Sequence, residues 1–461
     1  MNNIIMMSDS YKTSHYKQYP PKTEKVYSYF ESREGAKYDA TLFSGLQYFL
    51  MKYMTGEVVT QEKIDYAEGR INAHMGEGTF NRAGWEYILK EHDGRLPIKI
   101  RAVDEGSLVP TNNVLMTVEN TDPACYWLTN YLETLLVQTW YPSTVATQSY
   151  EMRKVLQRYL DTTGSDEVDF KLHDFGFRGV TCPEQAGLGG MAHLVSFKGT
   201  DNMEALEYAK DYYHEDMAGF SIPASEHSTI TAWGRENETA AMRNMLEQYP
   251  TGLVACVSDS YNIWEACRNK WGGELKDQVL ARDGVLAVRP DTGQPVHSVL
   301  KVLETLGKAF GTFKRKGYRV LDPKVRVIQG DGIDASMMSN ILAKMESNGW
   351  SADNITFGSG GGLLQKLNRD TQRFAFKCSS VIVDGERRDV FKDPITDGGK
   401  ISKKGKLKLV WDNERYRTVS SNDPDYSSSA NELRLVYLDG TMKRVHNFAD
   451  VRERAKDLVL V

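Results

Sequence analysis

Apolar residues follow a strand-like pattern near both ends of the chain. They alternate with polar residues over residues 98–103 and 115–119, and residues 25–33 form an aromatic-rich run that ends in charge. Similar runs return later, at residues 380–383, 407–410 and 433–437. Helical spacing lies between the early runs, so the pattern predicts a discontinuous α+β domain whose sheet is built from residues 1–150 and 376–461.

A different pattern occupies residues 151–375. Short apolar runs end in a turn that carries glycine or aspartate, and a helical stretch usually follows. The runs are residues 170–175, 193–197, 220–222, 253–257, 285–288, 325–328 and 354–357. Their spacing of roughly 25–40 residues is that of a βα crossover unit, which predicts parallel strands. The number of units and the charges after the strands favour an α/β barrel over a doubly wound sheet.

In such a barrel the loops that follow the strands meet at one face, where the active site lies. The polar and glycine residues of these loops are His173, Arg178, Asp201, His227, Asp259, Asp291, Asp331 and the glycines at 360–362. We therefore expect these residues to converge.

His227 follows a turn at Pro223 and opens what the pattern predicts to be a long helix. The partial positive charge of a helix N-terminus favours a neutral imidazole, which can act as a base or a nucleophile. A lone histidine at a helix start is more often a cap or a packed residue. The neighbouring loops favour a functional role, because they bring Asp259, Asp291 and Asp331 toward His227. One of these carboxylates would hold Mg²⁺ through water or orient the imidazole. Each of them alone is also typical of a helix cap.

A glycine-rich run at residues 358–362 lies between a strand and a helix, which is typical of a phosphate site or of a tight turn. Arg178 and Arg289 follow barrel strands beside carboxylates, where guanidinium groups bind phosphate. The lysines at 403–408 are interpreted as a solvated loop. No basic stripe with interleaved aromatic residues is visible, so a phosphorylated small molecule fits better than a nucleic acid.

Composition agrees with a soluble globular protein. Hydrophobic residues make up 41% and charged residues 26%, and the net charge of −5 gives no general attraction to nucleic acid or to an anionic membrane. The five cysteines form no C-x-x-C pair, which favours a reducing compartment. No signal-peptide pattern and no apolar run of about 20 residues is present, so we expect a cytoplasmic protein without a membrane partner.

Several long motifs resemble the nicotinamide phosphoribosyltransferase family over almost the full length. They are residues 9–12, 15–21, 173–176, 197–201, 226–234, 288–291, 326–332 and 357–366. The resemblance implies a type II phosphoribosyltransferase fold, with an irregular α/β barrel and a sheet domain from both chain ends. It also implies a homodimer with active sites at the subunit interface. The reaction would convert nicotinamide and phosphoribosyl diphosphate into nicotinamide mononucleotide and pyrophosphate for NAD salvage, with ATP as co-substrate.

The same resemblance assigns the residues that bind nicotinamide. Phe175 would stack on one face of the pyridine ring, and Tyr11 from the other subunit would cover the opposite face. Asp201 would accept a hydrogen bond from the amide NH₂, which repels nicotinic acid. Arg289 and Ser221 would complete this subsite.

Catalysis and phosphate binding are assigned in the same way. ATP would phosphorylate His227, Asp259 would orient its ring, and Asp291 would contact the ribose or the metal–pyrophosphate unit. The implied phosphoribosyl and phosphate ligands are Arg178, Arg33, Asp291, Gly330, Asp331, Gly360, Gly361, Arg369, Lys377, Lys392 and Lys400. Mg²⁺ would bridge the pyrophosphate without a direct protein ligand.

The chain departs from the family in a shorter loop after Glu34 and at three single positions, and other functions stay open. Ala255 stands where the family has Ser, Ala287 where it has a bulkier aliphatic residue, and Phe177 where it has Tyr, so Ala287 would widen the tunnel beside the pyridine. A nicotinate phosphoribosyltransferase is disfavoured by Asp201, and a non-catalytic signalling homologue by the intact set around His227. A barrel aldolase or dehydrogenase would need a Schiff-base lysine or a dinucleotide fingerprint, and neither is visible.

Overall fold

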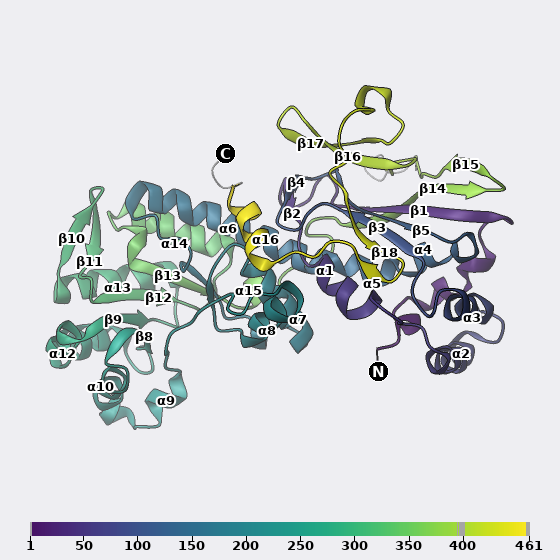
Figure 1. Ribbon diagram of the computed structural model, residues 1–461. Helices are drawn as coiled ribbons and strands as arrows, with labels where there is room; N and C mark the ends of the chain where they lie inside the picture. The colour runs from purple at the N-terminus through teal and green to yellow at the C-terminus, as the bar shows by residue number, and fades with distance from the viewer. Residues whose placement is uncertain (1, 394, 396–401, 458–461) are drawn as a thin grey trace. The chain divides into compact units, whose positions relative to one another are not determined.

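The computed structural model describes residues 2–393, 395 and 402–457, and the chain forms two compact units (Figure 1). The first comprises Met1–Thr147, Asp211–Glu215 and Leu367–Val461. The second comprises Gln148–Lys210 and Asp216–Lys366. Both ends of the chain therefore belong to one unit, and the middle of the chain forms the other.

The first unit is built on a seven-stranded antiparallel sheet in the order β15-β14-β1-β5-β3-β18-β19. The strands are β1 Thr23–Glu31, β3 Ile98–Ala102, β5 Val114–Asn120, β14 Ala375–Val383, β15 Glu386–Asp389, β18 Arg434–Leu438 and β19 Thr441–Met442. Strand β1 pairs with β5 on one side and with β14, from the later part of the chain, on the other. The prediction of one sheet from both chain ends is confirmed.

Smaller elements complete this unit. Two antiparallel two-stranded sheets join β2 with β4 and β16 with β17. Their bounds, with those of the helices, are β2 Ala40–Leu42, β4 Leu108–Pro110, β16 Leu407–Asp412, β17 Arg415–Ser420, α1 Leu46–Phe49, α2 Gln61–Met75, α3 Arg82–Glu91, α4 Leu128–Tyr131, α5 Glu133–Leu136 and α16 Phe448–Asp457.

The lysine run near β16 is not a solvated loop, so that interpretation is wrong. Lys403 pairs with the buried carboxylate of Glu31, and Lys406 pairs with Glu119 at 3.1 Å. Lys408 is only 8% exposed. The run packs over the sheet because each buried carboxylate is stabilised by a cation that reaches it.

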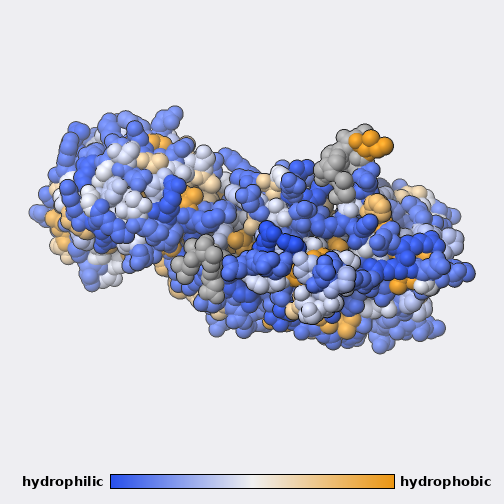
Figure 2. Space-filling model, turned by 90° about the horizontal axis from the view of Figure 1, so that it is seen from above, coloured by the Kyte–Doolittle hydropathy of each residue, from blue (hydrophilic) through white to orange (hydrophobic). Residues whose placement is uncertain are grey.

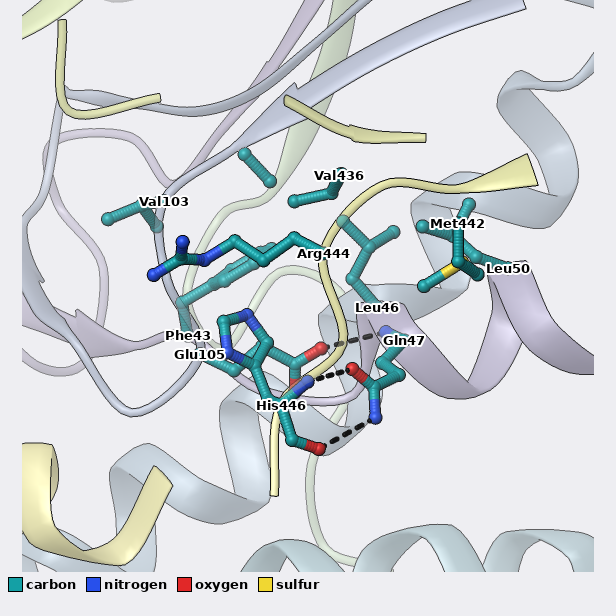
Figure 3. A pocket seen from close by; sticks show the side chains of 11 residues that line it. Phe43, Leu46, Gln47, Leu50, Val103, Glu105, Val436, Met442, Arg444 and His446 are labelled. Carbon is teal, nitrogen blue, oxygen red and sulfur yellow. Dashed lines mark hydrogen bonds between the residues drawn. The ribbon is translucent and has the colours of Figure 1, made fainter. Parts of the chain in front are cut away.

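A small cavity of about 10 Å³ lies in the first unit, and it has room on the order of one water molecule (Figure 3). Beside it the Gln47 amide holds the segment before α16, accepting from the His446 N–H at 2.7 Å and donating to its carbonyl at 3.0 Å. The buried Glu105 carboxylate accepts from the Gln47 N–H at 2.7 Å. None of the residues predicted for the active site lines this cavity.

The second unit contains a six-stranded parallel sheet in the order β7-β6-β13-β12-β9-β8. The strands are β6 Leu172–Asp174, β7 Gly199–Thr200, β8 Thr251–Val257, β9 Asp283–Arg289, β12 Val325–Gln329 and β13 Ile355–Ser359. The extended segment 220–225 runs between the two edge strands. It forms parallel bridges from Phe220 to Gly199 of β7 and from Ala224 to Ala255 of β8. The sheet thereby closes into an irregular barrel, which confirms the predicted fold class.

Helices follow the strands, and Figure 1 shows α13 and α14 running along one side of β9, β12 and β13. The helices are α6 Trp140–Thr163, which begins in the first unit, α7 Pro183–His193, α8 Met203–Tyr213, α9 His227–Thr231, α10 Glu238–Gln248, α11 Ile263–Glu265, α12 Lys276–Ala281, α13 Pro295–Phe310, α14 Ala335–Ser347 and α15 Gly361–Leu364. A hairpin of β10 Thr312–Arg315 and β11 Tyr318–Leu321 follows α13.

One predicted strand is wrong. Residues 193–197 are the end of α7 and a buried turn, and the strand of this unit is the short β7 that follows. The small residues of α7 let the helix pack within the core, so an apolar run here needs no strand to bury it.

The face of the molecule in Figure 2 is predominantly hydrophilic, with hydrophobic residues scattered over it. Within the ranges that the structure covers, every helix is too short or too polar to span a bilayer.

Candidate active site

The loops after the barrel strands carry most of the predicted site residues. Parallel strands end at the same edge of a sheet, so their following loops lie at one end of the barrel. The order is Phe175 and Arg178 after β6, Asp201 after β7, His227 after the closing segment, Asp259 after β8, Asp291 after β9, Gly330 and Asp331 after β12, and Gly360 and Gly361 after β13.

His227 is the first residue of α9, which is much shorter than the predicted helix. The helix ends at Thr231, and Gly234 then adopts a φ of 86° that glycine tolerates and that turns the chain before α10. Thr229 Oγ1 accepts the N–H of the preceding Glu226 at 3.3 Å, which fixes the start of the turn. The orientation of His227 therefore depends on its side-chain contacts rather than on a long helix.

Asp259 is the main partner of His227. Its Oδ1 lies 3.0 Å from His227 Nε2, and its Oδ2 accepts from the Asp291 N–H at 2.8 Å and from Thr292 Oγ1 at 2.7 Å. The Asp259 side chain is 3% exposed, whereas that of His227 is 43% exposed. Burial raises the pKa of the Asp259 carboxyl, but the hydrogen bonds from Thr292, Asp291 and His227 outweigh it and the net pKa is lowered. A carboxylate held in this way fixes the imidazole ring and its Nε2 proton.

Asp291 lies on the other side of the imidazole. Its Oδ1 accepts from Arg289 Nε at 3.0 Å and Nη2 at 2.8 Å, while its Oδ2 lies 3.9 Å from His227 Nδ1. The structure thus brings His227, Asp259, Asp291 and Arg289 into one cluster. Thr292 belongs to the same cluster, and sequence reasoning did not identify it because a threonine in a βα loop has no distinctive spacing.

Phe175 lies inside the barrel end, against glycines of two neighbouring strands. A Cβ at Gly358 would come within 1.9 Å of the Phe175 ring, so glycine is required there, and one at Gly330 would come within 3.2 Å, which is a tight approach. Phe175 also packs against the buried cluster of Ala255, Ala287 and Ile328. Small side chains from adjacent strands therefore face an aromatic ring, as a flat apolar ligand requires.

Asp201 follows β7 and is exposed, and its carboxylate accepts a short hydrogen bond from Ser221 Oγ. Burial lowers the pKa of His173, and the charge of Asp201 opposes that shift, so His173 lies close to Asp201. The structure thus joins Asp201 and Ser221 and sets a carboxylate at this end of the barrel.

Behind this subsite lies a buried pair that sequence reasoning missed. Asp174 is fully buried, and its Oδ2 accepts from Asn202 Nδ2 at 2.9 Å while its Oδ1 accepts from the Gly176 N–H at 2.7 Å. The available signal was a carboxylate immediately before Phe175 and an amide immediately after Asp201.

Asp174 makes the stability of the fold depend on pH. Burial raises its pKa from 3.8 to about 6, although the hydrogen bonds from Asn202 and Gly176 oppose the shift. Since the folded-state pKa exceeds the unfolded value, proton binding stabilises the fold at low pH, and this contribution is lost as the pH rises through about 6.

We expect the free energy of unfolding of the wild type, minus that of Asp174→Asn, to fall by about 2 kcal/mol between about pH 4.5 and about pH 7.5. Asparagine cannot ionise, so the variant lacks this titration. Urea unfolding at the two pH values measures the difference, with Asp277→Asn, at an exposed position of α12, as the control. A difference that does not change with pH would show that Asp174 is not the titrating group.

The loops after β6 and β13 pack closely on one another. A Cβ at Gly179 would lie 3.3 Å from the Gly361 N atom, and one at Gly360 would lie 3.3 Å from the Phe175 carbonyl oxygen. Arg178 is exposed in the 3₁₀ turn between Gly176 and Gly179. The loop that carries Arg178 thus lies beside the glycine backbone at the start of α15, a combination that suits an anion.

The loop after β12 is held by a side chain of that strand. Gln329 Nε2 donates to the carbonyl of Asp331 at 3.1 Å, and the Asp331 side chain is exposed.

The remaining predicted residues belong to the first unit, where a cationic cluster forms around Lys377. Burial lowers the Lys377 pKa, Glu133 opposes this, and the charges of Lys392, Arg33 and Arg369 lower it further. Cations that depress one another's pKa lie close together and suit a polyanion.

Two further predicted residues belong to the first unit. Tyr11 is 57% exposed. Lys400 lies outside the described residues.

Comparison with known proteins gives the same picture. The nicotinate phosphoribosyltransferase (NAPRTase) family model matches residues 170–440, and the model for the nicotinamide phosphoribosyltransferase N-terminal domain matches residues 3–100. A relative from Xanthomonas campestris pv. campestris (strain 8004), named nicotinamide phosphoribosyltransferase, is 48% identical and aligns over 99% of this chain and 98% of its own. One of the same name from Acinetobacter baylyi (strain ATCC 33305 / BD413 / ADP1) is 33% identical over 98% of this chain and 97% of its own.

Two solved structures share the fold. Nicotinate-nucleotide pyrophosphorylase from Pyrococcus furiosus aligns with a TM-score of 0.60 at 16% identity, over 99% of this chain and 96% of its own. Human nicotinic acid phosphoribosyltransferase aligns with a TM-score of 0.60 at 15% identity, over 99% of this chain and 93% of its own. The closed parallel barrel and the separate antiparallel sheet are thus those of a type II phosphoribosyltransferase. The chain belongs to the nicotinate phosphoribosyltransferase family and is an enzyme of the phosphoribosyltransferase class.

Proposed function

We propose that the protein transfers a phosphoribosyl group from phosphoribosyl diphosphate to nicotinamide, forming nicotinamide mononucleotide and pyrophosphate in NAD salvage. The observation that carries the choice of base is the Asp201 carboxylate, hydrogen-bonded to Ser221 at the end of the strand beside that of Phe175. A carboxylate accepts the N–H of a carboxamide and repels the charge of nicotinic acid. The names of the full-length relatives from Xanthomonas and Acinetobacter support the same base.

Phe175 then stacks on the pyridine ring. Its ring is held against Gly358 and Gly330, and the face turned away from these glycines would meet the planar base. Ser221 orients Asp201, and Tyr11 of a second subunit covers the opposite face in the proposed homodimer. The site works in the cytoplasm on soluble substrates.

ATP enters through His227. The neutral ring donates a hydrogen bond from its Nε2–H to Asp259, which leaves the Nδ1 lone pair as the nucleophile. Nδ1 attacks the γ-phosphorus of ATP, the bond from that phosphorus to the ADP oxygen breaks, and ADP leaves with the electron pair. The proton stays on Nε2, where Asp259 stabilises the positive charge of the phosphorylated ring.

Cations take up the charge that develops on the leaving pyrophosphate. Loss of pyrophosphate gives the ribose carbon oxocarbenium character, and fixed positive groups stabilise the departing anion. The proposed phosphate ligands are Arg178, Gly330, Asp331, Gly360 and Gly361 of the barrel and Arg33, Arg369, Lys377, Lys392 and Lys400 of the first unit.

Mg²⁺ fits this site as an ion carried by the substrate. Both oxygens of Asp259 already accept hydrogen bonds, whereas Asp291 has Oδ1 on Arg289 and only Oδ2 turned toward the imidazole. Asp291 would therefore hold the ion through water, and Mg²⁺ when bound neutralises charge on the diphosphate.

The test compares the two bases directly. Purified protein is incubated with phosphoribosyl diphosphate, Mg²⁺ and either nicotinamide or nicotinic acid, with and without ATP, and the mononucleotides are separated by mass. We expect nicotinamide mononucleotide at a higher kcat/KM and stimulation by ATP. A preference for nicotinic acid, or no turnover of either base, would reject the proposal.

Mass analysis of the peptide of residues 221–233 after incubation with ATP and Mg²⁺ tests the coupling separately. We expect an acid-labile phosphate on His227. A stable phosphate on a hydroxyl residue of this peptide, or none, would reject the phosphohistidine.

Thr292 should be a positioning residue for this step. Thr292→Val removes the Oγ1 donor to Asp259 Oδ2, so we expect phosphohistidine formation to slow by about 10-fold, as the loss of a hydrogen bond to a charged group predicts. Thr292→Ser keeps the hydroxyl and should restore the rate. Rapid-quench measurement of the phosphoenzyme gives both values, and equal rates in the two variants would contradict the role.

A further inference from the structure

A fully buried polar pair connects the two strands whose ends carry the base-recognition residues. Asp174 is the last residue of β6 and is 0% exposed, and Asn202 follows β7 by two residues and is 1% exposed. Asn202 Nδ2 donates to Asp174 Oδ2 at 2.9 Å. The two residues precede Phe175 and follow Asp201, respectively, so each is covalently next to a residue of the base subsite.

Each member of the pair also holds main-chain groups of these loops. Asp174 Oδ1 accepts the Gly176 N–H at 2.7 Å, which fixes the turn after Phe175, and its carbonyl oxygen accepts the Asp201 N–H at 3.0 Å. Asn202 donates from Nδ2 to the carbonyl of Ala186 in α7 at 2.9 Å. The pair therefore anchors both recognition loops to each other and to one helix.

Helix α7 leaves space for this pair at Gly190. A Cβ there would lie 2.4 Å from Asn202 Nδ2 and 2.9 Å from Asp174 Oδ2. A glycine in the middle of a helix is destabilising relative to alanine, and burying a carboxylate costs more. Packing alone would be served as well by apolar side chains, so the pair has a role that needs its directional bonds.

We propose that Asp174 and Asn202 are positioning residues that fix Phe175 and Asp201 relative to each other and so set the affinity for the pyridine base. Their hydrogen bonds determine the distance between the aromatic ring that stacks on the base and the carboxylate that reads its amide. The inference rests on the proposed function. It concerns the base, because His227 and the proposed phosphate ligands other than Arg178 lie on other loops.

Asn202→Asp tests the pair, because it replaces the Nδ2 donor with an oxygen that faces the Asp174 carboxylate. At about pH 8 we expect the KM for nicotinamide to rise by about 10-fold, whereas the KM for phosphoribosyl diphosphate and the rate of phosphohistidine formation stay within about twofold. At about pH 6 a proton shared between the two carboxyls restores a donor, so the KM should return toward that of the wild type at the same pH. Asp201 is the charged group that acts on Asp174, and comparing the variant with the wild type at each pH removes its effect on the KM.

A purely structural role would not give a pH-dependent rescue confined to one substrate. Asn348→Asp, at the exposed end of α14, is the matched control and should behave as the wild type at both pH values. If Asn202→Asp does not fold, Asn202→Ala removes the donor without adding a charge and should raise the nicotinamide KM at every pH.

An unchanged nicotinamide KM in the variant that folds, or an equal rise for both substrates, would overturn the inference. The base preference of the wild type distinguishes this result from a failure of the proposed function. If the wild type prefers nicotinic acid, the proposed function is rejected, and the pair is then tested with that base, whose KM should rise because Phe175 still moves. A nicotinic acid KM that stays constant would reject the pair as well.

Discussion

Asp201→Asn should shift the ratio of kcat/KM for nicotinamide to that for nicotinic acid by about 100-fold toward the acid, or about 3 kcal/mol of discrimination. The substitution keeps the shape of the side chain and removes its charge, so a negatively charged base is no longer repelled. It also replaces one acceptor oxygen with a donor, which weakens the bond to the amide NH₂ of nicotinamide. Asp201 is exposed and bonded to Ser221, so the fold should tolerate the change.

Competition of the two bases for limiting phosphoribosyl diphosphate measures this ratio in one mixture, with Asp277→Asn on α12 as the control of equal charge. A ratio that stays within about twofold of the wild type would show that Asp201 does not read the base.

The carboxylates around His227 were predictable from the sequence because they follow closely after the ends of two apolar runs. Strands β8 and β9 pair with Val257 opposite Arg289, so residues two positions beyond each strand end lie side by side. Asp259 and Asp291 occupy those two positions. A rule that counts from the end of an apolar run therefore identifies both, together with Arg289, before any contact is known.

The environment of His227 was less accessible to sequence reasoning. The helical pattern after Pro223 continues through Trp233, but α9 ends at Thr231 because the chain turns at Gly234. Closure of the barrel by the segment 220–225 rests on isolated bridges to β7 and β8 rather than on a regular strand. Such a segment has no periodicity of its own, since the neighbouring strands supply its partners.

Polar pairs between residues far apart in the sequence were not predicted, for a related reason. Lys403 appears in a lysine-rich stretch that composition alone assigns to solvent, yet its partner Glu31 lies on β1, hundreds of residues earlier in the chain. Asp174 and Asn202 are separated by 28 positions and become a pair only when β6 and β7 align. Local pattern predicts which face a residue occupies, and the tertiary fold decides which groups meet there.

His227→Ala should abolish the ATP-dependent part of the reaction and leave the ATP-independent part in place. Without the imidazole no phosphoryl acceptor remains between Asp259 and Asp291, so the phosphoenzyme should not form. We expect kcat/KM measured with ATP to fall on the order of 100-fold, to the level that the wild type shows without ATP. The ratio of ADP released to mononucleotide formed should fall to zero.

His74→Ala, at an exposed position of α2, is the matched control, and thermal unfolding checks that both variants are folded. Asp259→Asn separates orientation from chemistry, because the ring remains but loses the anion that holds its Nε2 proton. That variant should still form phosphohistidine, at a reduced rate. If His227→Ala instead keeps the full ATP stimulation, the phosphoryl group passes through another residue, and the cluster around Asp259 serves only to bind the substrate.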